Sequence, residues 1–370
     1  MELTWKAAEQ FAQLGEVIDV REHGNGNIND TYLVTVNGDE NDKFVLQRIN
    51  THVFSRPKLI IQNLRTFTEH MDWRLEKELP TSPRRWHVPH ICKTRMGEDF
   101  YIDERESFWR AITFVNHSRS YETVRDENHA REVGYALGRF QSLLSDLNID
   151  KMHDTLVGFH ITPQYLCKYD QILSKGKERS DSPEIRYCHR MVEERREGLT
   201  VLEDAKENGQ LQERIIHGDP KINNIMISDQ TGEAISVIDL DTVKPGLVQY
   251  DIGDCLRSSC NLQGENARNL DDIRFETDLA KAILDGYISV AKDFLTDADY
   301  GYFFDSIHLL TFECGLRFFQ DYLAGNVYFK VKHPEHNLER AVVQFKLTEC
   351  IEAQEGEIRA LIEDLKLAVR

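Results

Sequence analysis

The 370-residue sequence lacks several features that would assign it to a class at once. No apolar run approaches the roughly 18 residues needed to cross a bilayer, and the first six residues lack the basic-then-apolar order of a secretory signal. We therefore expect a cytoplasmic protein with no membrane partner. The seven cysteines are scattered and include no C-x-x-C pair, so neither a disulfide framework nor a zinc site is predicted, only reduced thiols.

Positive charge is also scarce. The chain has 45 basic and 63 acidic side chains, which gives a net charge of −18. A protein that binds a nucleic-acid backbone needs clustered Lys and Arg to replace counterions, so nucleic acid is not expected as a partner. The acidic balance still permits a small anionic ligand held by a metal ion or by a few donors.

Alternating apolar residues in the first third of the chain predict β-strands. The strand-like segments are residues 17–20, 31–36, 44–46, 88–94 and 108–115. After Pro57, apolar residues recur at spacings of 4, 3 and 4 through Met71, which predicts one helix.

From about residue 116 the pattern becomes helical, with apolar residues at spacings of 4, 3, 4 and 3 between Val133 and Leu147. A strand-rich block joined to a larger helical block predicts two lobes. The exception is a strand-loop-strand segment between Arg214 and Thr242. Functional residues concentrate in such loops, so we looked for chemistry there.

That segment carries a set of residues suited to phosphoryl transfer. Asp219 lies five residues before Asn224, and Asp239 ends the following predicted strand. Transfer from a nucleotide requires a carboxylate that orients or accepts the acceptor's proton, and oxygen ligands for Mg²⁺. The spacing is that of a kinase catalytic loop followed by a metal-binding Asp. We expect Asp219 to act as the base and Asn224 and Asp239 to bind Mg²⁺.

Each piece of this segment has a simpler interpretation when taken alone, as a turn or as an edge strand. Their combination at a workable spacing favours function. Asp241 is left open between a second metal ligand and a solvated acid at a strand end. Lys221 is left open between contact with the transferring phosphate and a solvated loop position.

Several blocks of the sequence together resemble the aminoglycoside phosphotransferase and choline kinase superfamily. They are residues 217–224, 237–242, 250–254, 44–50 and 316–329. The last two blocks are similar to the N-acetylhexosamine 1-kinases within that superfamily, and the resemblance extends over roughly residues 17–350. It implies an α+β, bilobal, protein-kinase-like fold. The β-rich N-lobe, residues 1–115, would cover the nucleotide, and the mainly helical C-lobe, residues 116–370, would carry the catalytic loop and the acceptor site.

The resemblance implies a phosphotransferase with an alcohol group as acceptor. It would use ATP and Mg²⁺ to phosphorylate the anomeric C1 hydroxyl of N-acetylglucosamine or N-acetylgalactosamine, acting as a monomer on a small-molecule sugar and a nucleotide. The alternatives are a kinase of the same fold for choline, homoserine or an aminoglycoside and, less favoured, a nucleotide-binding regulator without activity.

Roles for further residues follow from the resemblance. Arg317 and Tyr328 match positions that face the acceptor sugar in the hexosamine kinases, although Arg317 also suits a salt bridge between packed helices. The base, Asp219, would contact the same sugar. Asp251 and His217 would support the catalytic loop rather than react.

The nucleotide contacts are less certain from the sequence. Gly24, Gly26 and Asn27 lie between two predicted strands, where glycines admit phosphates to backbone N–H groups but also form ordinary hairpin turns. The third strand has Gln47-Arg48 where protein kinases have a phosphate-binding Lys. Arg48 supplies that charge if it faces the cleft; the alternative is that Arg48 lies on the surface and Gln47 faces inward. Val115 is expected at the hinge between the lobes, where the backbone would bond the adenine edge.

Overall fold

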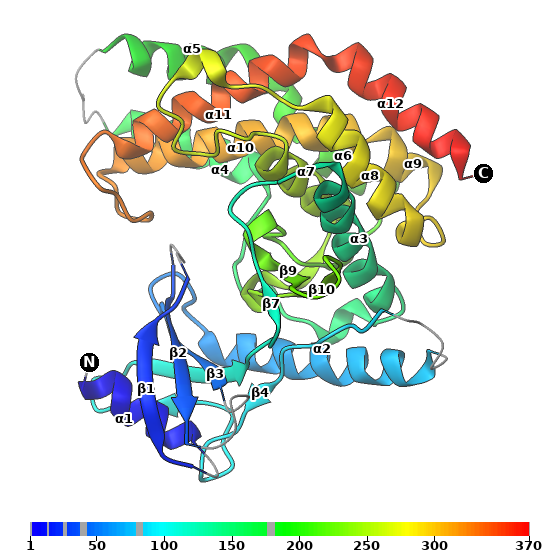
Figure 1. Cartoon of the computed structure of the whole chain (residues 1–370). Coiled ribbons are helices and arrows are strands. Elements are labelled where there is room, and N and C mark those ends of the chain that lie inside the picture. The colour runs from blue at the N-terminus through cyan, green and yellow to red at the C-terminus, as the bar shows by residue number, and fades with distance from the viewer. Residues whose placement is uncertain are drawn as a thin grey trace.

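A computed structural model describes residues 2–12, 15–24, 28–37, 43–78, 84–175 and 182–369. The N-terminal part of the chain forms a lobe around a β-sheet, and most of the remainder forms a larger helical lobe (Figure 1). This is the bilobal α+β architecture expected from the sequence. None of the described helices is both long enough and apolar enough to cross a membrane.

The N-lobe is built on an antiparallel sheet. Its strands run in the order β1 (Val17–Glu22), β2 (Asp30–Val36), β3 (Lys43–Ile49), β6 (Phe108–Thr113) and β4 (Ile91–Cys92), with β5 (Tyr101–Ile102) also paired to β6. Segment 88–94 pairs over only two residues, and Pro89 within it has no N–H to donate to a ladder.

Two helices flank this sheet. Helix α1 (Glu2–Phe11), which the sequence analysis did not predict, packs Phe11 against the sheet face that carries Leu46 and Trp109. Helix α2 (Pro57–Lys77) begins at Pro57 and buries the predicted apolar stripe. Asn63 of α2 ties the N-lobe to the C-lobe, because its Nδ2 donates to the carbonyls of His153 at 2.8 Å and Val243 at 2.9 Å.

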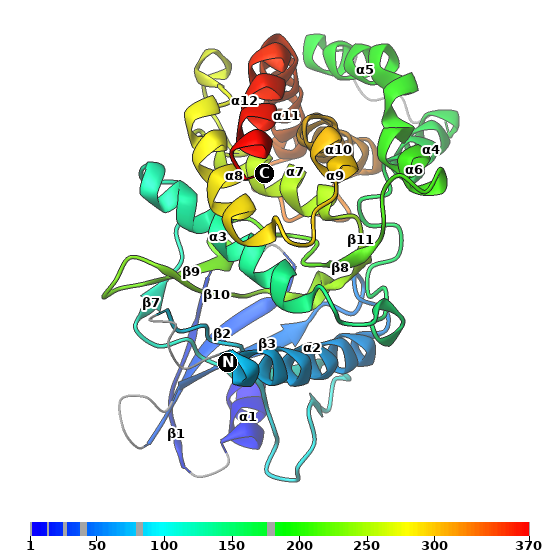
Figure 2. The ribbon, with the colours of Figure 1, turned by 90° about the vertical axis from the view of Figure 1, so that its right-hand side faces the viewer.

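The C-lobe consists mainly of helices. They are α3 (Glu127–Leu144), α4 (Thr162–Ser174), α5 (Pro183–Arg195), α6 (Val201–Glu207), α7 (Val248–Ser259), α8 (Thr277–Ala291), α9 (Asp297–Gly301), α10 (Phe303–Ala324), α11 (His336–Ala353) and α12 (Glu355–Ala368). Two small sheets lie between these helices and the N-lobe (Figure 2). One joins β10 (Ala234–Val237), β9 (Ile225–Ser228) and β7 (Ser118–Arg119), and the other joins β11 (Lys244–Gly246) to β8 (Arg214–Ile216).

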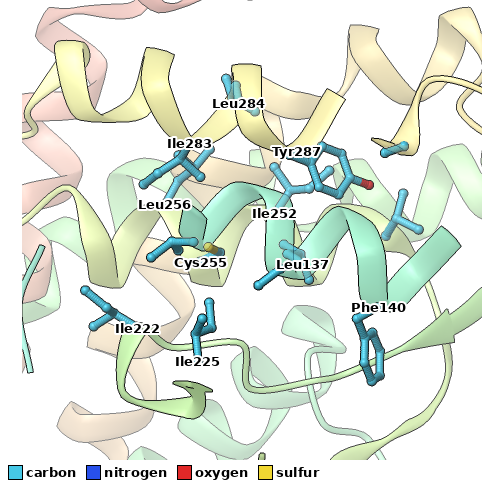
Figure 3. Close-up of a cluster of buried hydrophobic side chains, with 14 of the residues drawn as sticks. Leu137, Phe140, Ile222, Ile225, Ile252, Cys255, Leu256, Ile283, Leu284 and Tyr287 are labelled. Carbon is cyan, nitrogen blue, oxygen red and sulfur yellow. The ribbon is translucent and has the colours of Figure 1, made fainter. Parts of the chain in front are cut away.

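The loop between β8 and β9 is anchored in the C-lobe core. Figure 3 shows Ile222 and Ile225 of this segment below the apolar side chains of α3, α7 and α8. Both isoleucines are buried, and burying such a side chain stabilises a fold by about 1.5–3 kcal/mol. The loop that carries the predicted catalytic residues is therefore held in the core by Ile222 within it and Ile225 directly after it.

Helices α3 and α8 cross in very close contact because glycines lie at the crossing. A Cβ placed on Gly134 would overlap the carbonyl of Ile283, and one placed on Gly286 would overlap the carbonyl of Arg131. The obstacle in each case is the backbone of the other helix, which a side-chain rotation cannot relieve.

We expect Gly286→Ala to lower the free energy of unfolding by about 1–3 kcal/mol, because overpacking forces backbone shifts. A matched control is Gly356→Ala in α12, where an added Cβ meets no atom within 4 Å; Ala should there stabilise the helix by about 0.5–1 kcal/mol. Urea unfolding of the two variants measures both effects. A similar stabilisation at the two positions would contradict the close crossing of α3 and α8.

Candidate active site

Asp251 at the start of α7 holds the backbone of the loop at residues 217–224. Its carboxylate is fully buried and accepts the N–H groups of His217 and Gly218, each at 2.8 Å. Gln141 of α3 donates a third hydrogen bond to it at 2.8 Å. Burial raises the pKa of Asp251, and the nearby His217 ring and these donors offset only part of that rise. The carboxylate thus acts as an acceptor for the loop, away from solvent.

His217 is fully engaged in the scaffold. Its Nε2 lies 2.9 Å from the carbonyl of Ile238 and must donate to it, which leaves Nδ1 to accept the N–H of Asp219 at 3.2 Å. Both ring nitrogens are therefore occupied, and His217 has no free position at which to accept a proton from a substrate.

Asp219 is the loop carboxylate that remains accessible. Its side chain is 27% exposed, and Oδ2 lies 2.9 Å from Nζ of Lys221. Burial lowers the pKa of Lys221, but the charges of Asp219 and Asp239 raise it by more, so the pKa lies above the ordinary value and the ammonium stays charged. The structure thus pairs Lys221 with Asp219, which differs from an isolated solvated lysine.

Asn224 and Asp239 are arranged in a way that suits a divalent cation. Nδ2 of Asn224 donates to the carbonyl of Asp219 at 2.7 Å, which fixes the amide and leaves Oδ1 as the atom able to bind a metal. The backbone of Asp239 is left-handed, with φ 63° and ψ 58°, a conformation that is uncommon for a residue with a side chain and is often found at functional sites. Its carboxylate makes no hydrogen bond or ion pair with the described residues.

Electrostatics at Asp239 also favour a bound cation. Burial raises the pKa of this carboxyl to about 6, and the charges of Asp241 and Asp219 contribute to the rise. No three His, Cys, Asp or Glu side chains cluster as metal ligands within the described ranges. Mg²⁺ at a nucleotide site needs only one or two protein ligands besides phosphates and waters, so the pair of Asn224 and Asp239 fits that ion.

Asp241 differs from both of the alternatives left open for it. Its side chain is 3% exposed, so it is not a solvated acid. Oδ1 forms an ion pair with Nη2 of Arg110 on β6, and Oδ2 accepts a hydrogen bond from Nδ2 of Asn29 at 2.6 Å. In this structure its charge is thus directed at the N-lobe and is not free to bind a metal.

The prediction for Arg48 requires a correction. Successive side chains of a strand point to opposite faces, and β3 turns Gln47 inward, where it is buried against Arg110. The side chain of Arg48 projects from the outer face of the sheet, where it is half exposed, and its Nε donates to Oδ2 of Asp30 at 2.9 Å. The sequence analysis missed Arg110. The available signal was a lone Arg among the apolar residues of strand β6.

The expected adenine end of the cleft is apolar. Val115 is 7% exposed and packs with Met226 and Ile235, with Ile238 against them. Its carbonyl accepts the hydroxyl of Ser118 at 2.8 Å. Met226 and Ile238 were not identified from the sequence, because single apolar residues in short strands carry no distinctive signal.

The structure describes only Gly24 of the three residues that were predicted to contact the phosphates. Gly24 has φ +75°, a left-handed conformation that favours glycine. Gly26 and Asn27 lie outside the described residues.

Arg317 on α10 lies in a box of aromatic rings. Its guanidinium carbon is 4.7 Å from the ring centroid of Phe159, 5.5 Å from that of Tyr165 and 5.6 Å from that of Phe329. It forms no hydrogen bond or ion pair with any described residue, so the alternative of a helix-packing salt bridge is not found. Burial lowers its pKa, but Tyr165, Tyr328 and Glu313 raise it further, and the net pKa lies above the ordinary value.

Tyr328 is held near this box by the loop after α10. Its backbone N–H donates to Oδ1 of Asp321 at 2.8 Å, and its ring meets that of Phe329 edge-on with centroids 4.8 Å apart. The structure therefore places Tyr328 and Arg317 around the same phenylalanine.

His160 connects this box to the catalytic loop and was not found from the sequence. It follows Phe159, has a left-handed backbone with φ 67° and is 3% exposed. Its Nε2 lies 2.6 Å from the carbonyl of Gly218, and Nδ1 lies 3.0 Å from Oε1 of Glu313. Since Glu313 is one helical turn before Arg317, the box and the backbone next to Asp219 are joined through two buried side chains.

The structure has two lobes and a braced loop with the accessible carboxylate of Asp219. An amide and a second carboxylate lie near that group. These features are those of a kinase-like phosphotransferase. Residues 19–285 match the phosphotransferase enzyme family, and the chain belongs to this family.

Solved structures with the same fold include three that match nearly the whole chain. An aminoglycoside phosphotransferase from Alicyclobacillus acidocaldarius has a TM-score of 0.61 at 15% identity, over 97% of this chain and 96% of that one. A choline kinase from Cryptosporidium parvum has a TM-score of 0.61 at 14% identity, over 98% and 99%. An amicoumacin kinase in complex with AMP-PNP, Ca²⁺ and its ligand has a TM-score of 0.55 at 14% identity, over 98% and 93%. At these identities the likeness shows the fold.

We expect Asp251→Asn to lower the free energy of unfolding by about 1–3 kcal/mol, because the amide would turn an N–H toward one of three buried donors. A matched control is Asp229→Asn, which alters an exposed carboxylate paired with Arg119 and should change stability by less than about 0.5 kcal/mol. Urea denaturation followed by circular dichroism compares the two. If both changes are equally small, Asp251 does not brace the loop.

Proposed function

We propose that the protein is an ATP- and Mg²⁺-dependent kinase that phosphorylates the anomeric C1 hydroxyl of N-acetylglucosamine or N-acetylgalactosamine. The observation that carries the proposal is the loop in which accessible Asp219 lies beside Asn224 and Asp239, both free to bind a cation. The amicoumacin kinase of the same fold binds AMP-PNP and Ca²⁺, which supports a nucleotide and a divalent cation as ligands here.

In the proposed reaction, Asp219 orients the C1 hydroxyl and accepts its proton. The hydroxyl oxygen forms a bond to the γ-phosphorus, the bond from that phosphorus to the bridging oxygen breaks, and ADP leaves with the bonding electrons. Lys221, paired with Asp219, lies where its charge can neutralise the transferring group. Mg²⁺ held by Asn224 and Asp239 would neutralise phosphate oxygens.

We assign the rest of the nucleotide site by the same reasoning. The adenine would lie against Val115 and the apolar residues around it, with the hinge backbone at its edge. Gly24, Gly26 and Asn27 would cover the phosphates through their backbone N–H groups.

The acceptor proposal depends on the charge of Arg317. Two of the structures with this fold are named for choline and aminoglycosides, and a cationic acceptor is best held by acids or by empty aromatic boxes. Here the box formed by Phe159, Tyr165 and Phe329 already encloses a guanidinium that forms no ion pair with a described carboxylate. Such a site favours a neutral acceptor rich in hydrogen-bond acceptors, such as sugar hydroxyls and an acetamide carbonyl, with Tyr328 as a further partner.

The test is a panel of acceptors incubated with the full-length protein, ATP and Mg²⁺. The panel contains both N-acetylhexosamines, glucose, choline, homoserine and an aminoglycoside. ADP release is measured, and ³¹P NMR identifies the product. We expect a sugar 1-phosphate from an N-acetylhexosamine. Faster turnover of choline, homoserine or the aminoglycoside would replace the acceptor, and nucleotide binding without any turnover would favour a regulator.

Replacing the two carboxylates should separate their roles. We expect Asp219→Asn to lower kcat by about 10²- to 10⁴-fold, with the affinity for ADP little changed, because the base contacts the acceptor. Asp239→Asn should instead abolish the dependence of ADP affinity on Mg²⁺. Steady-state kinetics and calorimetry measure the two effects. Parental turnover by the first variant, or unaltered metal dependence in the second, would remove that residue from its assigned role.

Arg317→Met tests the acceptor box. Loss of a charged donor to the sugar should raise KM for the hexosamine by about 10- to 100-fold, since hydrogen bonds to charged groups contribute about 1.5–3 kcal/mol, while KM for ATP stays constant. The matched control is Arg359→Met, which alters another arginine stacked on a phenylalanine but in contact with the acids Glu355 and Asp305. An unchanged KM for the sugar would place the acceptor elsewhere.

A further inference from the structure

At the inward position in register with Arg110 of β6, the third strand of the N-lobe presents no cation. The side chain of Gln47 points inward, and that of Arg48 projects from the outer face of the sheet. The neighbouring strand β6 supplies a cation on the inward face, because Arg110 is paired in register with Gln47. Nε and Nη2 of Arg110 donate to Oε1 of Gln47 at 3.0 and 2.7 Å, and its side chain is 2% exposed.

Arg110 reaches the same segment of chain that carries the proposed metal ligand. Its Nη2 forms an ion pair with Asp241, two residues after Asp239. Asn29, which lies between the glycine loop and β2, donates to the second oxygen of Asp241 at 2.6 Å and accepts the backbone N–H of Asn50 at 2.9 Å. The guanidinium thus lies between the inner face of the sheet and the segment after Asp239, and Asn29 reaches the same Asp241 carboxylate from the N-lobe. In the proposed function these parts would surround a nucleotide's phosphates.

One end of this guanidinium has no partner. Nη1 of Arg110 is buried and has no hydrogen-bond acceptor among the described residues. A buried charged donor is costly to leave unpaired, so its occurrence in a cleft calls for an explanation. Phosphate oxygens are the acceptors that a guanidinium fork fits best.

We propose that Arg110 binds the phosphate chain of the nucleotide and so supplies from β6 the positive charge that β3 does not provide. Asp241 balances this charge in the nucleotide-free chain and keeps the guanidinium aimed at the cleft, with Gln47 fixing its plane. The inference rests on the nucleotide use in the proposed function and is independent of the acceptor.

The test compares the affinities of the full-length protein for ADP and for adenosine, measured by calorimetry in EDTA so that only side chains neutralise the phosphates. We expect Arg110→Met to weaken ADP binding by about 10- to 100-fold, the range for a lost charge-assisted contact, and to change adenosine binding by less than about threefold. The matched control, Arg48→Met, removes the neighbouring arginine on the outer face and should leave both affinities unchanged.

Two further variants guard against misfolding and test the position of the charge. Arg110→Met/Asp241→Asn removes both buried charges together, so no carboxylate is left unpaired, and should show the same selective loss of ADP binding. Gln47→Lys/Arg110→Met restores a cation on the inward face from β3 and should recover at least about tenfold of the lost ADP affinity, as expected for one restored charge-assisted contact.

The ratio of the two affinities decides the outcome. Equal weakening of ADP and adenosine would make Arg110 a structural link between the lobes, and unchanged ADP binding would exclude it from the phosphate site. Either result overturns the inference. If the unaltered protein binds neither ligand even when Mg²⁺ replaces EDTA, the proposed function fails instead, so the two failures are distinguishable.

Discussion

The geometry of the loop at residues 217–224 depends on one contact. The buried carboxylate of Asp251 accepts two backbone N–H groups of that loop. A carboxylate removed from water needs donors to replace its lost hydration, and His217, Gly218 and Gln141 provide them. Gln141 in turn accepts the hydroxyl of Tyr287 at 2.6 Å. Because Tyr287 belongs to the core shown in Figure 3, the loop is connected to α3, α7 and α8 through a continuous buried network.

This network leaves few atoms of the loop free for chemistry. Both ring nitrogens of His217 are engaged with the backbone. Gly218 has φ +85° and lies so close to Thr242 that an added Cβ would come within 2.8 Å of its carbonyl oxygen, so this position requires glycine. What remains available is the carboxylate of Asp219, the side-chain oxygen of Asn224 and the carboxylate of Asp239. Rigidity in the supporting residues helps to keep these three groups in position, although only Asp219 forms an ion pair, with Lys221.

The sequence was sufficient for those parts of the site whose geometry is local. Asp219 and Asn224 are five residues apart in one loop, and a strand pair brings Asp239 back beside them, so spacing alone indicated their proximity. The helix at 57–77 was equally predictable, since its apolar stripe and its initial Pro57 are both local signals. Helix α1 shows the limit of this approach, because ten residues with alternating small and large apolar positions did not stand out among the surrounding strands.

The remaining site depends on contacts that no local pattern encodes. Gln47 and Arg48 lie between apolar residues on both sides, so the phase of the strand, and hence which of them faces inward, was undetermined. The ion pair of Arg110 with Asp241 joins residues 131 positions apart, and His160 meets Glu313 across 153 positions. Such pairs become visible only once the chain is folded.

Several of the contacts between the lobes meet at one short segment. Asn63 of α2 donates to the carbonyl of Val243, and both Asn29 and Arg110 bind the carboxylate of Asp241. This segment directly follows Asp239, whose left-handed backbone sets the direction of the chain there. Because the three donor side chains belong to the N-lobe, a movement of that lobe acts directly on residues 241–243. In the proposed function, a nucleotide bound beneath the N-lobe and the proposed metal ligand Asp239 would therefore be linked through these polar contacts at residues 241–243.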